Sequence, residues 1–242
     1  MANNIAIKNL HAGYGSIHVL HGIDMRIEDH EIVALLGTNG NGKSTLIKCI
    51  AGLVKPGMGE IVATIDDVPH SLVGMSVEAI VNLGISLVPE GRHLFPRLTV
   101  DENLLLGASR PAARLCKEEN LELSFELFPK LKERRRQLAG SMSGGEQQML
   151  ALARGLMSAP KILLIDEPSV GLAPIIVKQM IDKIAELKVR KGLTVLMAEQ
   201  NFTQTMRIAD RGYVIVHGEI KHEGASSELH DNALVRQLYL GM

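Results

Sequence analysis

The fold is decided by Gly37-Thr38-Asn39-Gly40-Asn41-Gly42-Lys43-Ser44-Thr45, which follows the apolar run Ile32–Leu36 directly. This pattern, G-x-x-x-x-G-K-[ST], predicts a loop whose backbone N–H groups cradle phosphates at the start of a helix. Its glycines let the backbone curl so that successive N–H groups face one anion. We expect Lys43 to reach the β- and γ-phosphates of a nucleotide and Ser44 to offer a hydroxyl to Mg²⁺.

A second candidate site lies far along the chain, where the apolar run Ile162–Ile165 is followed by Asp166 and Glu167. Ligands of open α/β sheets bind at the carboxyl ends of the strands, so these carboxylates are well placed for chemistry. We expect Asp166 to hold the metal, directly or through water. Glu167 is the candidate base that orients and deprotonates the attacking water.

Short apolar runs and one amphipathic segment predict an α/β fold with a mostly parallel sheet. The segment from Pro174 to Gly192 carries apolar residues at helical spacing and lies between two such runs, which implies a right-handed crossover. The other expected elements are strands at Ile85–Val88 and Thr194–Ala198, antiparallel strands at Ile5–Leu10 and Ile23–Ile27 beside the sheet, a helical insertion at Leu98–Leu138, a hairpin at Tyr213–Val216 and Glu219–His222, and a closing helix at Asp231–Leu240.

Composition excludes several classes of protein. The 242 residues carry 26 Lys and Arg against 27 Asp and Glu, a balance of −1, which argues against binding of nucleic acid through its phosphate backbone. Aromatic residues make up 3%, with no Trp, so platforms for base stacking are scarce. No apolar run approaches the roughly 20 residues of a membrane span. The chain has only two cysteines, and its start lacks the features of a signal peptide, so we expect the protein to reside in a reducing cytosol.

The stretch Ser141-Met142-Ser143-Gly144-Gly145-Glu146-Gln147-Gln148 resembles the signature motif of ABC ATPases, with Met142 and Glu146 where leucine and glutamine are most usual. The resemblance runs from Tyr14 to the C-terminal region. It implies a P-loop NTPase of the ABC type, with an antiparallel β subdomain and an inserted α-helical subdomain, that binds ATP and Mg²⁺. It also implies head-to-tail dimers in which the signature residues contact the nucleotide of the other subunit in trans; these residues are Ser143, Gly144, Gly145 and Glu146. The resemblance further implies that Tyr14 stacks on adenine.

Three departures from the general family pattern indicate a subfamily. Glu90 stands where a glutamine near Mg²⁺ is usual, and Gln200 stands at the position of the switch histidine. Glu90 is expected to touch the metal through water, and Gln200 to donate a hydrogen bond to the γ-phosphate. The loop Ser169–Pro174 lacks the usual aspartate. Together these features resemble an ATP-binding subunit of branched-chain amino acid importers, and relatives serving urea or short amides are similar.

The resemblance implies one ABC ATP-binding domain over residues 1–242. Residues 1–90 and 159–242 would form the core with its antiparallel part, and residues 91–158 the helical subdomain. Expected partners are transmembrane permease subunits, a second ATP-binding subunit and, indirectly, an extracytoplasmic receptor, at the cytoplasmic face of the cell membrane. Phe95 is a candidate docking contact, and Arg134–Arg136 are expected on the solvated face of a helix. Open alternatives are another cargo, a non-transport ABC ATPase and an ATP-gated dimer without turnover.

Overall fold

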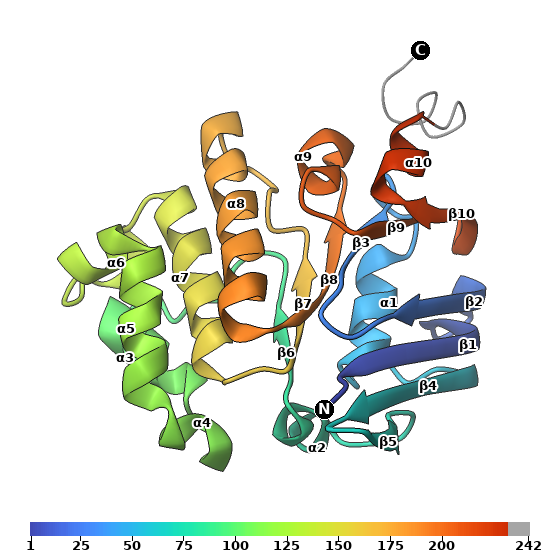
Figure 1. Ribbon diagram of the computed structural model, residues 1–242, viewed down its shortest axis with the longest axis horizontal. Helices are drawn as coiled ribbons and strands as arrows, with labels where there is room; N and C mark the ends of the chain where they lie inside the picture. Colours follow the sequence, from blue (N-terminus) through green and yellow to red (C-terminus); the bar gives the residue numbers. More distant parts are fainter. Residues whose placement is uncertain (232–242) are drawn as a thin grey trace.

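The computed structural model describes residues 1–231, which form two sheets flanked by helices (Figure 1). Within these residues, the strand order in the central sheet is β10-β9-β3-β8-β7-β6, and in the second sheet β2-β1-β4-β5. The central strands are β3 (Ile32–Leu36), β6 (Ile85–Val88), β7 (Ile162–Asp166), β8 (Thr194–Glu199), β9 (Arg211–Val216) and β10 (Glu219–Ala225). The second sheet holds β1 (Asn4–Tyr14), β2 (Ile17–Ile27), β4 (Met58–Ile65) and β5 (Val68–Ser71).

The central sheet confirms the predicted α/β fold. Strands β3, β7 and β8 are buried along their whole lengths, as expected where helices or another sheet cover both faces. They pair in parallel, with Leu36 opposite Glu199 and Asp166 opposite Ala198. The loops that follow these three strands therefore leave the same edge of the sheet side by side.

The antiparallel sheet is larger than the sequence predicted. Its first hairpin runs to Tyr14, which lies opposite Ile17, and two further strands, β4 and β5, were not foreseen. Strand β5 is short and contains Pro69, which lacks a backbone donor and is tolerated because β5 lies at the edge of the sheet. The first strands pair with β4 and β5 in a sheet separate from the central one, which confirms the expected antiparallel β subdomain.

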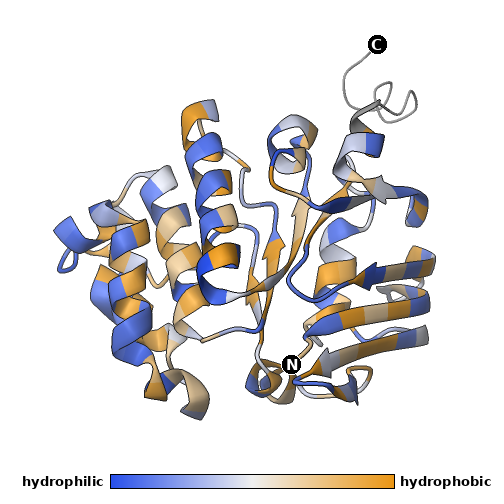
Figure 2. Ribbon diagram, in the orientation of Figure 1, coloured by the Kyte–Doolittle hydropathy of each residue, from blue (hydrophilic) through white to orange (hydrophobic). Residues whose placement is uncertain are grey.

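The insertion between β6 and β7 is helical, as predicted, and lies on one side of the central sheet (Figure 1). Figure 2 shows polar residues on the outer helices and apolar residues along the central strands. No helix within residues 1–231 is both long and apolar enough to span a membrane. The helices are α1 (Lys43–Ile50), α2 (Val77–Leu83), α3 (Val100–Gly107), α4 (Pro111–Leu115), α5 (Lys117–Leu127), α6 (Pro129–Glu133), α7 (Gly144–Met157), α8 (Pro174–Lys191), α9 (Phe202–Met206) and α10 (Ser226–Asp231).

Helix α8 and the C-terminal hairpin form where the sequence predicted them. The hairpin of β9 and β10 is confirmed, with Val216 opposite Glu219. Helix α8 begins at Pro174 and ends before Gly192, as its sequence predicted. The expected closing helix at Asp231–Leu240 lies outside the described residues except for its first position.

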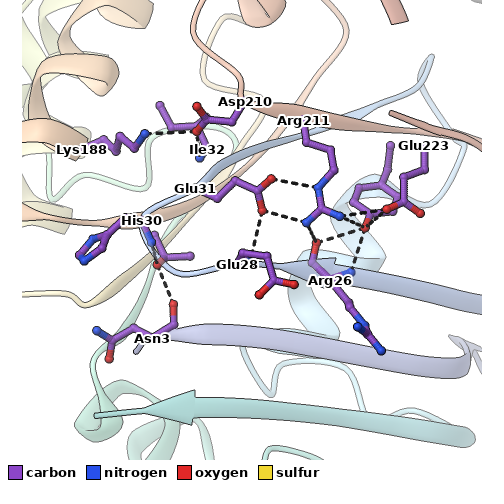
Figure 3. Close-up of polar contacts among 12 residues, drawn as sticks. Asn3, Arg26, Glu28, His30, Glu31, Ile32, Lys188, Asp210, Arg211 and Glu223 are labelled. Carbon is purple, nitrogen blue, oxygen red and sulfur yellow. Dashed lines mark hydrogen bonds and ion pairs between the residues drawn. The ribbon is translucent and has the colours of Figure 1, made fainter. Parts of the chain in front are cut away.

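A polar network ties the antiparallel sheet to the central sheet (Figure 3). Arg211 on β9 binds both carboxylate oxygens of Glu31 at 2.9 Å and also donates to Glu223 at 2.9 Å. The buried hydroxyl of Tyr213 accepts hydrogen bonds from the backbone N–H of Arg26 on β2 and from Arg211, and donates to Glu223 at 2.8 Å. These contacts fix the position of β2 relative to β9.

Replacing Tyr213 by phenylalanine is expected to lower stability by about 1–2 kcal/mol, because the part-buried N–H of Arg26 loses its acceptor and Glu223 loses a donor. The melting temperature should fall by roughly 3–6 °C. Burial raises the pKa of Tyr213 to about 12, and the hydrogen bond to Glu223 adds to the rise. The folded state thus keeps this proton more tightly than the unfolded state, so the contribution is full below pH 10 and declines between pH 10 and 12.

Thermal denaturation of both proteins at pH 8 and pH 11 measures this effect. The difference in melting temperature between the parent and Tyr213→Phe should shrink at pH 11. A constant difference would contradict the assignment of the shifted pKa to Tyr213. ATP turnover at 25 °C should stay within twofold, because the hydroxyl contacts none of the candidate site residues.

Candidate functional site

The predicted phosphate loop connects β3 to α1 at the carboxyl edge of the central sheet. Gly42 has a φ of 100°, and a Cβ at this position would lie 2.8 Å from Cδ2 of Leu20. Glycine is therefore required twice, by the left-handed backbone and by the close approach of β2. The same approach places the hairpin that carries Tyr14 beside the loop, with the Tyr14 ring about half exposed.

Asn41 fixes the loop from its other side, a role that sequence reasoning missed. Its side-chain nitrogen donates to the Thr38 hydroxyl at 2.8 Å, and its side-chain oxygen accepts from the backbone N–H of His217 at 2.9 Å. Its carbonyl accepts from the N–H of Gly218. The β9–β10 turn thus holds the phosphate loop in shape, and Asn41 is largely committed to these contacts.

Lys43 and Glu167 form a buried ion pair, with 2.8 Å between Lys43 Nζ and Glu167 Oε1. Their side chains are 2% and 7% exposed. The lysine also donates to the carbonyls of Gly37 at 2.7 Å and Thr38 at 3.1 Å. Glu167 has a φ of 42°, unusual for a residue with a side chain, and its N–H donates to Ala198 on β8. The expected phosphate-binding cation and the expected base therefore contact one another in this structure.

Ser44 and Asp166 come together as the predicted metal site requires. The Ser44 hydroxyl donates to Asp166 Oδ1 at 2.9 Å. Burial raises the pKa of Asp166, the hydrogen bond from Ser44 opposes the rise, and the charges of Glu167 and Glu90 add to it. A divalent cation would relieve this repulsion among carboxylates. Glu90 lies exposed near Asp166 rather than against it.

The oxygen atoms of Asp166 and Ser44 suit Mg²⁺ bound together with a nucleotide better than a metal ion whose ligands all come from protein side chains. No group of three or more His, Cys, Asp or Glu side chains within residues 1–231 could hold a metal ion. Mg²⁺ is usually bound through one or two carboxylates together with substrate phosphates and water. Asp166, the Ser44 hydroxyl and a nucleotide's phosphates would form such a set.

Gln200 lies beside the phosphate loop because its strand, β8, is the direct neighbour of β3. Its side-chain amide donates to the side-chain oxygen of Asn39. The preceding residue, Glu199, is 1% exposed and accepts hydrogen bonds from Ser169. Sequence reasoning missed Glu199, whose contacts join two loops of the site.

The signature segment forms the predicted helix start, at the N-terminus of α7. Ser143 caps the helix in a capping box with Glu146, whose carboxylate accepts from both the N–H and the hydroxyl of Ser143. Burial alone would raise the pKa of Glu146, but the bonds from Ser143 and the charge of Arg134 outweigh it and hold the pKa below its usual range. Ser143 is exposed. Within residues 1–231, no hydrogen bond or ion pair joins residues 143–146 to the phosphate loop.

The expectation for Arg134–Arg136 was wrong in its detail. Helix α6 ends at Glu133, so the three arginines follow the helix instead of lying on one of its faces. Arg134 pairs with Glu146 at 3.2 Å, and Arg135 binds both oxygens of Asp101. Arg134 therefore neutralises the carboxylate that replaces the usual glutamine of the signature segment.

The chain is similar in sequence to known proteins. A family model described as "ABC transporter" matches residues 20–170. The chain belongs to the ABC transporter family. The branched-chain amino acid transport ATP-binding protein BraG of Pseudomonas aeruginosa is 45% identical over 94% of this chain and 95% of its own length. The lipopolysaccharide export ATP-binding protein LptB of Haemophilus influenzae is 33% identical over 98% and 97% of the two chains.

The solved structures agree with the family assignment. The ADP conformation of MJ1267, an ATP-binding cassette of an ABC transporter, superimposes with a TM-score of 0.82 at 26% identity, covering 99% of each chain. As an ABC transporter ATPase subunit, the chain binds ATP, and its hydrolysis is coupled to transport through transmembrane permease partners.

Proposed function

We propose that this ABC ATPase subunit hydrolyses Mg-ATP to drive the import of branched-chain amino acids. The observation that carries the proposal is the convergence of Lys43, Ser44, Asp166, Glu167 and Gln200 at one edge of the central sheet. The similarity to BraG supports the cargo. The residue set resembles that of importers of urea or short amides as well, so these cargoes are the alternative.

In the proposed reaction, Lys43 leaves Glu167 and binds the β- and γ-phosphates. Glu167, now free, accepts a proton from the water that attacks the γ-phosphorus, while the bond to ADP breaks. Gln200 moves from Asn39 to donate to the γ-phosphate, and Tyr14 stacks on adenine. Mg²⁺, held by Ser44 and Asp166 with Glu90 acting through water, would neutralise charge on the phosphates.

The second site of the proposed mechanism comes from a second ATP-binding subunit, identical or related. Ser143 to Glu146 would contact the γ-phosphate held by the partner's phosphate loop. The exposure of Ser143 and its lack of contact with its own phosphate loop, among the described residues, support this arrangement. The exposed apolar residues Val170 and Ile175 lie next to the catalytic loop and suit burial against a second subunit.

A mixed dimer tests the head-to-tail arrangement. One subunit carries Ser143→Ala with an intact phosphate loop, and the other carries Lys43→Ala with an intact Ser143, so that each nucleotide site can be followed separately. In this dimer the intact loop faces the intact serine, so one complete site remains and hydrolysis should persist. With both changes in one subunit neither site is complete, and hydrolysis should be lower by about tenfold or more. The reference dimer carries both changes in one subunit, and equal turnover in the two mixed dimers would contradict the model.

A groove on the helical side is the proposed docking place for the permease at the cytoplasmic membrane face. It has a volume of about 580 Å³ and is lined by residues that include Phe95, Leu106 and Arg154. The Phe95 ring is half exposed and lies 5.9 Å from the guanidinium of Arg154.

The cargo is tested with the intact complex, including any extracytoplasmic receptor, by measuring which solutes stimulate ATP turnover. Stimulation by urea or short amides alone would favour the alternative cargo, and no turnover would indicate an ATP-gated dimer.

A further inference from the structure

Glu199 is a buried carboxylate that the proposed reaction does not use. It is the last residue of β8 and is 1% exposed. Four donors bind it: the N–H and hydroxyl of Ser169 at 2.9 and 2.7 Å, and the N–H groups of Gln200 and Asn201 at 3.0 and 3.4 Å. These donors come from two different loops.

The charge of Glu199 has no cationic partner among residues 1–231. Burial raises its pKa, and the hydrogen bonds from Ser169, Asn201 and Gln200 oppose the rise. Holding a carboxylate in such surroundings is costly unless hydrogen bonds compensate the lost water. The four donors supply that compensation, so the two loops that carry them are held firmly to the end of β8.

Both loops belong to the candidate site. Ser169 lies two residues after Glu167, the proposed base, and Gln200 is the proposed γ-phosphate contact. The Gln200 side chain reaches Asn39 in the phosphate loop. An unbroken chain of contacts therefore runs from Asn39 through Gln200 and Glu199 to Ser169, next to Glu167.

Resting on the proposed function, we propose that Glu199 is a positioning residue for ATP hydrolysis. Its carboxylate fixes the loop of the base against the loop of Gln200, so that both side chains face the same γ-phosphate. Because Glu199 acts through these two residues and does not touch ATP, its loss should change turnover more than ATP affinity. Misplacement of a reacting group by about 1 Å can cost about 100-fold in rate.

The test compares steady-state kinetics of Glu199→Gln, Ser169→Ala and the double variant. In either orientation the glutamine NH2 would face backbone N–H donors, that of Ser169 or those of Gln200 and Asn201. We therefore expect kcat to fall about tenfold or more while KM for ATP stays within threefold. Ser169→Ala should lower kcat by a smaller factor. The double variant should match Glu199→Gln within twofold, because both changes break the same link.

Matched variants separate positioning from simple loss of stability. Tyr213→Phe removes a buried hydrogen bond elsewhere and should lower the melting temperature without changing kcat. Ser169→Thr keeps the hydroxyl and should retain most of the activity of the parent. Normal kcat in Glu199→Gln, or multiplicative effects in the double variant, would overturn the positioning role alone. A parent protein without ATP turnover would instead overturn the proposed function and, with it, this inference.

Discussion

Replacing Glu167 by glutamine is expected to lower kcat for ATP hydrolysis about 100- to 1,000-fold, because the amide cannot take a proton from the attacking water. ATP binding should survive and become a few-fold tighter. The ion pair of 2.8 Å with Lys43 must break before the lysine reaches the phosphates, and glutamine removes this competition. Loss of the negative charge near the γ-phosphate acts in the same direction.

Single-turnover hydrolysis and equilibrium binding of a fluorescent ATP analogue measure the two effects separately. Glu133→Gln is the matched control, because it removes a carboxylate from an exposed pair with Lys130. The control should behave as the parent in both assays. Hydrolysis within twofold of the parent in Glu167→Gln would mean that another group is the base. Weaker ATP binding would mean that the ion pair does not compete with the nucleotide.

The competition between Glu167 and the phosphates was beyond the reach of the sequence. The motif around Lys43 and the run ending at Asp166 each predicted a local structure, a strand followed by a polar loop, and both were found. The two motifs are more than 120 residues apart, and their contact depends on the strand order β3-β8-β7. Periodicity and turn signals report on neighbours along the chain and carry no information about which strand lies beside which.

The same reason explains why Glu199 and Arg134 were missed. Glu199 is a polar residue at the end of an apolar strand, and nothing in its local sequence shows that it binds the loops of Ser169 and Gln200 together. Arg134 belongs to a run of three arginines, a pattern typical of a solvated surface, yet it pairs with Glu146. The role of a charged residue depends on partners that are distant in the sequence. Such partners can be identified from the sequence only where both residues belong to known family motifs. Strand β5 was missed for a local reason, its four residues and its proline.

Replacing Lys43 by alanine is expected to abolish detectable ATP binding and to destabilise the protein. The affinity falls because the loop loses its only side-chain cation toward the β- and γ-phosphates, leaving backbone N–H groups alone. Stability falls because Glu167, 7% exposed, would keep a buried charge without its partner. Breaking a buried pair from one side costs about 3 kcal/mol or more, so the melting temperature should drop by roughly 6–12 °C.

Combining Lys43→Ala with Glu167→Gln distinguishes the two consequences. The neutral glutamine no longer needs a cation, so the double variant should recover most of the lost melting temperature but neither ATP binding nor hydrolysis. Thermal denaturation without nucleotide, followed by titration with the fluorescent ATP analogue, checks both statements on the same samples. A double variant as unstable as Lys43→Ala would mean that the contacts of Lys43 with the Gly37 and Thr38 carbonyls, and not the pair with Glu167, hold the loop together.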